Sequence, residues 1–197
     1  MHLSQVSGPK GVQVGARHGA VARVVSGAGS VYDLALAAVA AGRGLAQEVA
    51  LRGLGDVVDL AEAARDGRLL LPVSHPDPAH LHMTGTGLTH LGSASARDAM
   101  HAKLGQAETL TDSMKMFKLG LDKGKPKDGE EGAQPEWFYK GAGTCVVPPE
   151  ADLPMPDFAL AGGEEGEIVG LYLIGPDGNP WRIGFALGNE FSDHVTE

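Results

Sequence analysis

Two apolar runs near the end of the chain are separated by a short segment rich in turn-forming residues. The runs span Ile168–Ile174 and Trp181–Leu187, and the segment between them, Gly175–Pro180, reads GPDGNP. Glycine and asparagine tolerate the positive φ angles of tight turns, proline presets its own φ, and aspartate bonds to nearby backbone. The pattern therefore predicts an antiparallel β-hairpin, the strongest constraint on folding in this sequence.

Three glutamates stand at the open end of this predicted hairpin. Glu165 and Glu167 begin the first run, and Glu190 follows the second. Residues i and i+2 of a strand point to one face, and the start of a hairpin lies beside its end. Two carboxylates ~5 Å apart repel by ~3 kcal/mol at an effective dielectric of about 20, which protonation, solvation or a cation relieves. Three oxygen donors suit Mg²⁺, Mn²⁺ or Ca²⁺, and a solvated strand edge is the plainer alternative.

The first 78 residues predict a small α/β region. Val21–Val25 has the composition of a short strand, and the apolar spacing over Val31–Val49 predicts one long helix. Val57–Arg65 predicts a second helix, and Leu69–Val73 predicts a buried strand. We therefore expect an N-terminal α/β domain over residues 1–78.

The remaining residues predict loops and strands. Residues 122–135 are rich in Lys, Gly, Glu and Asp without apolar periodicity, which indicates a solvated loop. Trp137–Lys140 begins an extended stretch, and Cys145–Val147 predicts another strand before a proline-rich loop. The predicted fold class is mixed α/β, with the second domain, residues 79–197, mainly β.

Composition excludes several classes of protein. The formal charge of −9 over 197 residues argues against a nucleic-acid surface, which is normally basic. The single cysteine, Cys145, cannot form an intramolecular disulfide. The longest apolar stretch, about Val31–Ala41, is too short for a membrane span, and no signal peptide pattern opens the chain. We therefore expect a cytoplasmic protein without membrane or nucleic-acid partners.

Four segments together resemble the fumarylacetoacetate hydrolase family. The family has an E-x-E pair followed by a strand that ends in an N-D-x-S-A-R-D-like sequence, which Glu165–Glu167 and Asn189–His194 match. Trp137–Lys140 resembles the family's F-x-K segment, and Gly85–His90 sits where the family has G-L-N-Y. The resemblance covers roughly residues 80–197 and looks most like a branch associated with bacterial sugar-acid catabolism.

The resemblance implies a β-rich catalytic domain, incomplete here, with a divalent cation, usually Mg²⁺, held by Glu165, Glu167 and Glu190. It also implies a 2-oxo acid substrate, for which a 2-keto-3-deoxy sugar acid is our preferred candidate. Dehydration or C–C bond cleavage would follow, with the metal acting as a Lewis acid toward the keto oxygen. Lys140 matches a basic residue near the substrate in relatives, and homodimers are usual in the family.

The chain departs from the family pattern at several positions. Glu190 stands where Asp is usual for the third ligand, and His194 replaces the family's arginine. The family's catalytic histidine falls at Ser93, so we take His90 and His101 as the candidate catalytic residues. The general base must reach the substrate proton, and an ordinary surface role stays open for both histidines.

The ending of the sequence adds a further expectation. Family members continue well beyond the third ligand, so the resemblance implies that these 197 residues are a C-terminally truncated part of a longer parent. The predicted hydrolase or lyase activity concerns that parent, and we expect the shorter chain to expose apolar strand edges and to be poorly soluble or inactive. A non-catalytic binding or assembly domain that retains the fold is the alternative.

Overall fold

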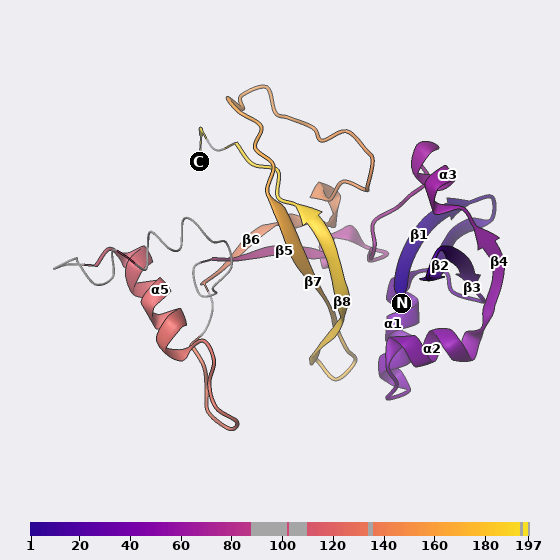
Figure 1. Cartoon of the computed structure of the whole chain (residues 1–197), viewed down its shortest axis with the longest axis horizontal. Helices are drawn as coiled ribbons and strands as arrows, with labels where there is room; N and C mark the ends of the chain where they lie inside the picture. The colour runs from indigo at the N-terminus through magenta and orange to yellow at the C-terminus, as the bar shows by residue number, and fades with distance from the viewer. Residues whose placement is uncertain (88–101, 103–109, 134–135, 194, 197) are drawn as a thin grey trace. The chain divides into compact units, whose positions relative to one another are not determined.

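The computed structural model describes residues 1–87, 102, 110–133, 136–193 and 195–196 (Figure 1). It contains both helices and sheets, so the predicted mixed α/β class is confirmed. The chain divides into two compact units, one made of residues 1–78 and 145–197 and the other of residues 79–144. The hairpin therefore belongs to the same unit as the N-terminal residues, whereas the division into domains 1–78 and 79–197 stays a prediction.

Four antiparallel strands open the first unit in the order in which they occur in the chain. They are β1 (His2–Gly8), β2 (Gly11–His18), β3 (Val21–Val25) and β4 (Leu54–Val58). The predicted strand β3 is confirmed, but the sequence did not reveal β1, β2 or β4. Their apolar residues are interspersed with polar ones, and of these three strands only β1 and β2 contain buried residues, whereas β4 is almost entirely exposed.

The predicted single helix over residues 31–49 is wrong, because the chain forms two helices there, α1 (Val31–Ala40) and α2 (Leu45–Arg52). Gly42 has a φ of 62°, and its N–H donates to the carbonyl of Val39, while the N–H of Arg43 donates to the carbonyl of Ala38. These bonds close a Schellman motif, which ends α1. Among the described residues no single helix could cross a membrane; only α1 and α2 together have the length and composition, and they are bent by 104°.

Two further predictions in this region need correction. The predicted helix over residues 57–65 is shorter, because Val57 pairs with Arg23 in the sheet and α3 (Leu60–Arg65) begins only after Asp59. The Asp59 carboxylate accepts a hydrogen bond from the Glu62 N–H at 2.9 Å and caps the helix. The predicted strand over residues 69–73 is reduced to a single bridge beside β1, and Pro72 lacks the N–H that further pairing needs.

The core of the first unit lies between the sheet and helices α1 and α2 (Figure 1). Leu34 is fully buried at its centre, and the other buried members come from β2, β3, α1, α2 and the turn before α1: Val14, Ala16, Val25, Ala28, Val31 and Val49. Ser30 caps α1 through a 2.9 Å hydrogen bond from the Asp33 N–H to its hydroxyl oxygen. The cap thus fixes where α1 begins, and the core contacts fix α1 against the sheet.

The second unit contains strands β5 (His82–Gly87) and β6 (Glu136–Ala142) and helix α5 (Asp112–Lys123). The two strands pair antiparallel, which confirms the extended stretch predicted over residues 137–140. Residues 124–133 form no helix or strand and are almost all exposed, as expected for a solvated loop. The strand predicted over residues 145–147 is wrong, because residues 143–145 form a short 3₁₀ helix. Another 3₁₀ turn spans Pro78–His80.

Candidate functional site

The predicted hairpin is confirmed and belongs to the first unit. It consists of β7 (Gly166–Ile174) and β8 (Pro180–Asn189), which pair antiparallel with one bulge after Leu171. In the turn, the Gly178 N–H donates to the Gly175 carbonyl at 2.9 Å, and Gly178 has a φ of 77° that other L-residues rarely adopt. The GPDGNP segment therefore turns the chain by its own local chemistry.

The open end of the hairpin, which we call the mouth, brings the three glutamates onto one face. The ladder extends past the strands, since Gly163 pairs with Ser192 and the Glu190 N–H donates to the Glu165 carbonyl at 2.8 Å. Glu165 therefore lies directly opposite Glu190, and Glu167 follows two positions along the strand. Residues opposite each other and residues two apart share a face, so all three glutamates lie on what we call the acid face.

The side chains of the three glutamates are not gathered into a preformed metal site. Among the residues that the structure describes, no group of three or more His, Cys, Asp or Glu side chains is arranged to hold a metal ion. Glu165 and Glu190 are half-buried, whereas Glu167 is exposed. The backbone spacing is nonetheless short, at about 5.5 Å between opposite α-carbons and ~6.6 Å between α-carbons two residues apart.

Two side chains of the Asn189–His194 motif, for which the sequence predicted no role of their own, hold the mouth together. Asn189 accepts a hydrogen bond from the Glu165 N–H at 3.0 Å, which joins the two strands beside the acids. The Asp193 carboxylate accepts bonds from the N–H groups of Leu160 and Ala161, at 2.8 Å and 3.1 Å. Asparagine and aspartate are residue types that readily accept bonds from backbone N–H groups, but no local pattern indicates partners this far away in the chain.

The Asp193 carboxylate accepts several hydrogen bonds at the mouth. The Thr196 hydroxyl, then the Leu160 N–H and the N–H groups of Val195 and Thr196, hold the pKa of Asp193 well below its ordinary value. Because the folded-state pKa is lowered, this stabilisation is fully present above the unfolded pKa of about 3.9 and is lost as the pH falls toward the folded pKa. The hydrogen bonds of Asp193 at the mouth should therefore persist at neutral and mildly acidic pH.

Replacement of Asp193 by asparagine is expected to loosen the mouth. The amide keeps one acceptor oxygen and turns an N–H₂ group toward the donors, so part of the bonding to Leu160 and Ala161 is lost. Their amide protons should exchange on the order of tenfold faster, measured by NMR hydrogen exchange and corrected for intrinsic rates. Asp157→Asn, in the exposed loop, is the control and should change neither amide. Unchanged exchange in Asp193→Asn would contradict this role.

Lys140, the predicted substrate-binding residue, lies on β6 in the second unit. Its ammonium nitrogen stands 4.6 Å from the centre of the Phe138 ring, a cation–π contact on one face of the strand. Gly85 lies beneath both side chains, since a Cβ at that position would stand 2.5 Å from atoms of each. The glycine therefore leaves room for Lys140 to lie along the sheet. The structure assigns no placement of Lys140 relative to the acid face.

The candidate catalytic histidines, His90 and His101, lie outside the described residues. The histidines at the beginning of the second unit are described, and one of them, His82, contacts the Tyr139 ring edge-on with centroids 6.0 Å apart. This contact is a packing interaction between β5 and β6. The identity of the general base therefore stays a prediction.

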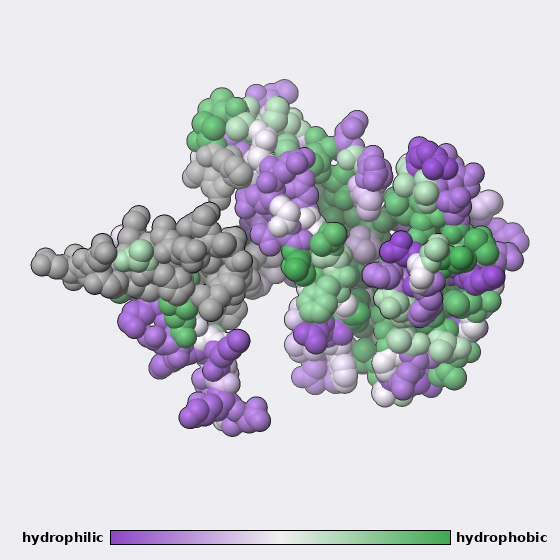
Figure 2. Space-filling view, viewed as in Figure 1, coloured by the Kyte–Doolittle hydropathy of each residue, from purple (hydrophilic) through white to green (hydrophobic). Residues whose placement is uncertain are grey.

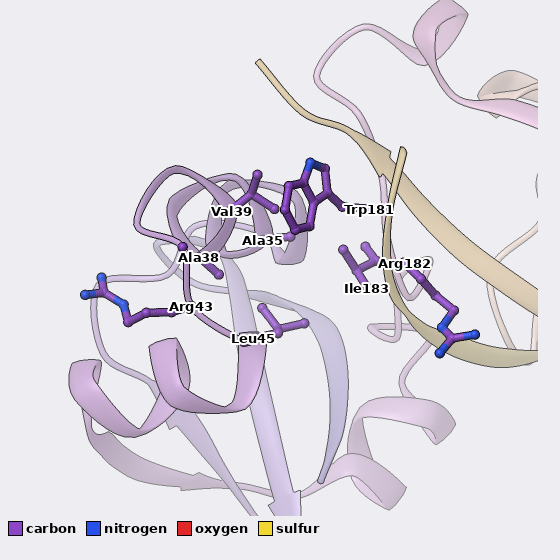
Figure 3. Close-up of a pocket in the computed structure, with 10 residues that line it drawn as sticks. Ala35, Ala38, Val39, Arg43, Leu45, Trp181, Arg182 and Ile183 are labelled. Carbon is purple, nitrogen blue, oxygen red and sulfur yellow. The ribbon is translucent and has the colours of Figure 1, made fainter. Parts of the chain in front are cut away.

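A hollow of about 340 Å³ lies in the first unit where α1 and α2 meet the turn end of β8 (Figure 3). The Trp181 indole stands over Ala35 and Val39, and the guanidinium groups of Arg43 and Arg182 point away from the hollow. The lining is therefore apolar, without converging polar groups that could act on a substrate. Of these two described sites, the acid face, with its three carboxylates, offers more oxygen donors than the hollow.

Comparison with known proteins does not identify a family. No protein-family model matches the chain, and no curated protein or solved structure matches it either. The resemblance to the fumarylacetoacetate hydrolase family, and the roles that it implies for individual residues, therefore stay predictions.

Proposed function

We propose that the protein is a divalent-metal-dependent hydrolase or lyase that acts on a small 2-oxo acid, with a 2-keto-3-deoxy sugar acid as the preferred substrate class. The observation that supports this proposal is the register of the hairpin, which sets Glu165 opposite Glu190 and puts Glu167 on the same face. The motifs that resemble the fumarylacetoacetate hydrolase family supply the reaction class, which is dehydration or C–C bond cleavage.

The donor set suits a hard divalent cation in chemistry and in backbone spacing, although the carboxylates are not gathered around one point in the described structure. Glu165, Glu167 and Glu190 would hold Mg²⁺, or Mn²⁺ or Ca²⁺ in its place. The ion, when bound, would supply Lewis-acid stabilisation of negative charge on a keto oxygen. We further propose Lys140 for substrate binding and His90 or His101 for proton transfer, in a cytoplasmic enzyme that forms homodimers.

A metal titration tests the proposal directly. Wild-type protein is expected to bind Mn²⁺ in a titration followed by electron paramagnetic resonance of the free ion, and Mg²⁺ should compete. The double variant Glu165→Ala/Glu167→Ala removes two of the three ligands and should weaken binding by at least 100-fold. Glu130→Ala/Glu131→Ala removes two adjacent acids from the solvated loop and should leave the affinity unchanged.

Two outcomes of this titration would overturn the metal-dependent enzyme. One is the absence of Mn²⁺ binding by the wild-type protein, and the other is equal affinity in the Glu165→Ala/Glu167→Ala variant. Where binding is seen, a panel of 2-oxo acids assayed with Mg²⁺ then identifies the substrate.

A non-catalytic binding or assembly domain is the second candidate. Two observations favour it: the described residues contain no preformed group of metal ligands, and the hairpin exposes a row of large apolar side chains. Such side chains mark interaction surfaces in many proteins. A protein of this class would fold and self-associate or bind a partner without retaining Mn²⁺, so the same titration separates the two candidates.

A further inference from the structure

The face of the hairpin opposite the acid face carries the most exposed apolar side chains of its strands. Strand alternation puts every second residue there, and a bulge shifts the alternation in β8 near the turn. We call this the apolar face, and its large members with their exposed fractions are Ile168 (74%), Tyr172 (60%), Ile174 (64%), Phe185 (63%) and Leu187 (89%). Figure 2 shows hydrophobic residues at the surface over the middle of the hairpin, between hydrophilic residues at its two ends.

The apolar face is large enough to form the centre of an association surface. Side chains of these types, exposed to these fractions, present roughly 500 Å² of apolar area in total. That area lies within the ~300–600 Å² of the largest patch on a typical monomer, which is often functional, and it is more than half of the ~800 Å² that each partner contributes to a standard interface. Rim residues and the strand edges can supply the remainder.

Opposite charges stand at the two ends of the apolar face. Glu164 precedes β7 on the apolar side of the mouth, because it alternates with Gly163 and Glu165 in the extended ladder. Arg182 lies near the turn on the same face, with its guanidinium 5.2 Å from the centre of the Phe185 ring. Arg182 pairs with Tyr172. Tyr172 follows Glu164 by eight positions, which corresponds to about 26 Å in an extended strand, so the two charges stand at opposite ends of the face.

We propose that the apolar face is the contact surface for a second copy of this chain. The charges select the relative orientation of the two copies. A two-fold axis that lies in the interface and runs perpendicular to the strands brings Glu164 of each copy to Arg182 of the other. The level midway between Glu164 and Tyr172 is that of Ile168, which pairs with Leu187. The two most exposed aliphatic side chains therefore meet at the axis, where binding energy usually concentrates. This proposal rests on the homodimer of the proposed function and gives it a surface, but it does not depend on metal binding or on catalysis, which the metal titration tests separately.

Analytical ultracentrifugation of the whole chain tests the surface. The wild type is expected to sediment as a monomer–dimer equilibrium with a dissociation constant of about 10 µM or tighter. Ile168→Glu/Leu187→Glu places charges at the axis and should weaken dimerisation at least 30-fold. Leu51→Glu/Val57→Glu is the matched control, because it charges two exposed apolar residues of the same unit, at 67% and 60%, outside the hairpin. The control should dimerise like the wild type.

Charge reversal tests the orientation of the two copies. Glu164→Arg and Arg182→Glu are each expected to weaken dimerisation about tenfold, because each places like charges together across the interface. The double variant Glu164→Arg/Arg182→Glu should restore the wild-type dissociation constant to within about threefold. A wild type that stays monomeric at about 100 µM, or axis variants that dimerise as tightly as the control, would overturn the proposal. Failure of the double variant to restore dimerisation would overturn the two-fold arrangement.

Discussion

Replacement of Gln5 by leucine is expected to lower the free energy of unfolding of the first unit by about 3 kcal/mol. Gln5 is only 1% exposed, and its side chain bonds to three residues in two segments. Its Nε2 donates to the Leu71 carbonyl at 2.8 Å and to the Ser74 hydroxyl at 3.3 Å, and its Oε1 accepts from the Val31 N–H at 2.8 Å. Leucine fills a similar volume but satisfies none of these groups.

The cost of this substitution comes from the groups left behind. The Val31 N–H at the start of α1 is buried and the Leu71 carbonyl is partly buried, so neither group is fully solvated in the variant. Each unpaired buried group costs about 1–3 kcal/mol. Urea denaturation followed by circular dichroism should show a lower midpoint with an unchanged slope. Gln47→Leu changes an exposed glutamine of α2 and should cost less than about 1 kcal/mol; equal effects would contradict the account.

Replacement of Leu34 by alanine is expected to lower the free energy of unfolding by about 2–5 kcal/mol. The Leu34 side chain is 0% exposed and lies on α1 within the core cluster that faces the sheet. Truncation removes apolar burial and leaves a cavity that neighbours such as Val14 and Val25 can fill only in part. Thermal unfolding followed by far-UV circular dichroism should show a clear fall in midpoint.

Leu51→Ala provides the matched control for this prediction. Leu51 lies on α2 and is 67% exposed, so the same chemical change removes little buried area. Its effect should stay within about 0.5 kcal/mol. A Leu34→Ala variant as stable as Leu51→Ala would mean that the cluster around α1 is not the core of the unit.

The local parts of the fold followed from the sequence because their causes are local. The turn between β7 and β8 forms from glycine, proline and aspartate within six residues, and the strand β3 lies between clear turn signals. The single helix predicted over residues 31–49 failed at Gly42, since its positive φ ends α1 where apolar spacing alone suggested continuation. Apolar periodicity reports which face is buried, and it is insensitive to a sharp break between two helices that share a core.

The candidate site could likewise be inferred from the sequence only in part. Hairpin pairing could be inferred from the turn, and with it the alignment of Glu165 with Glu190 at the mouth. The directions of the three carboxylates could not be inferred, because each glutamate side chain has several rotamers that only its surroundings select. The role of Asp193 also emerged only from the structure, since its partners Leu160 and Ala161 are more than 30 residues away.

By itself, the sequence determined the mixed α/β class, the hairpin and the presence of three acids at its open end, because short-range turn chemistry and strand alternation specify them. The tertiary structure alone decided that residues 1–78 and the hairpin share one unit, that Gln5 joins β1 to α1, and that one hairpin face stays exposed. These features depend on contacts between segments far apart in the chain. Such contacts arise from the packing of whole surfaces, which no local pattern of residues encodes.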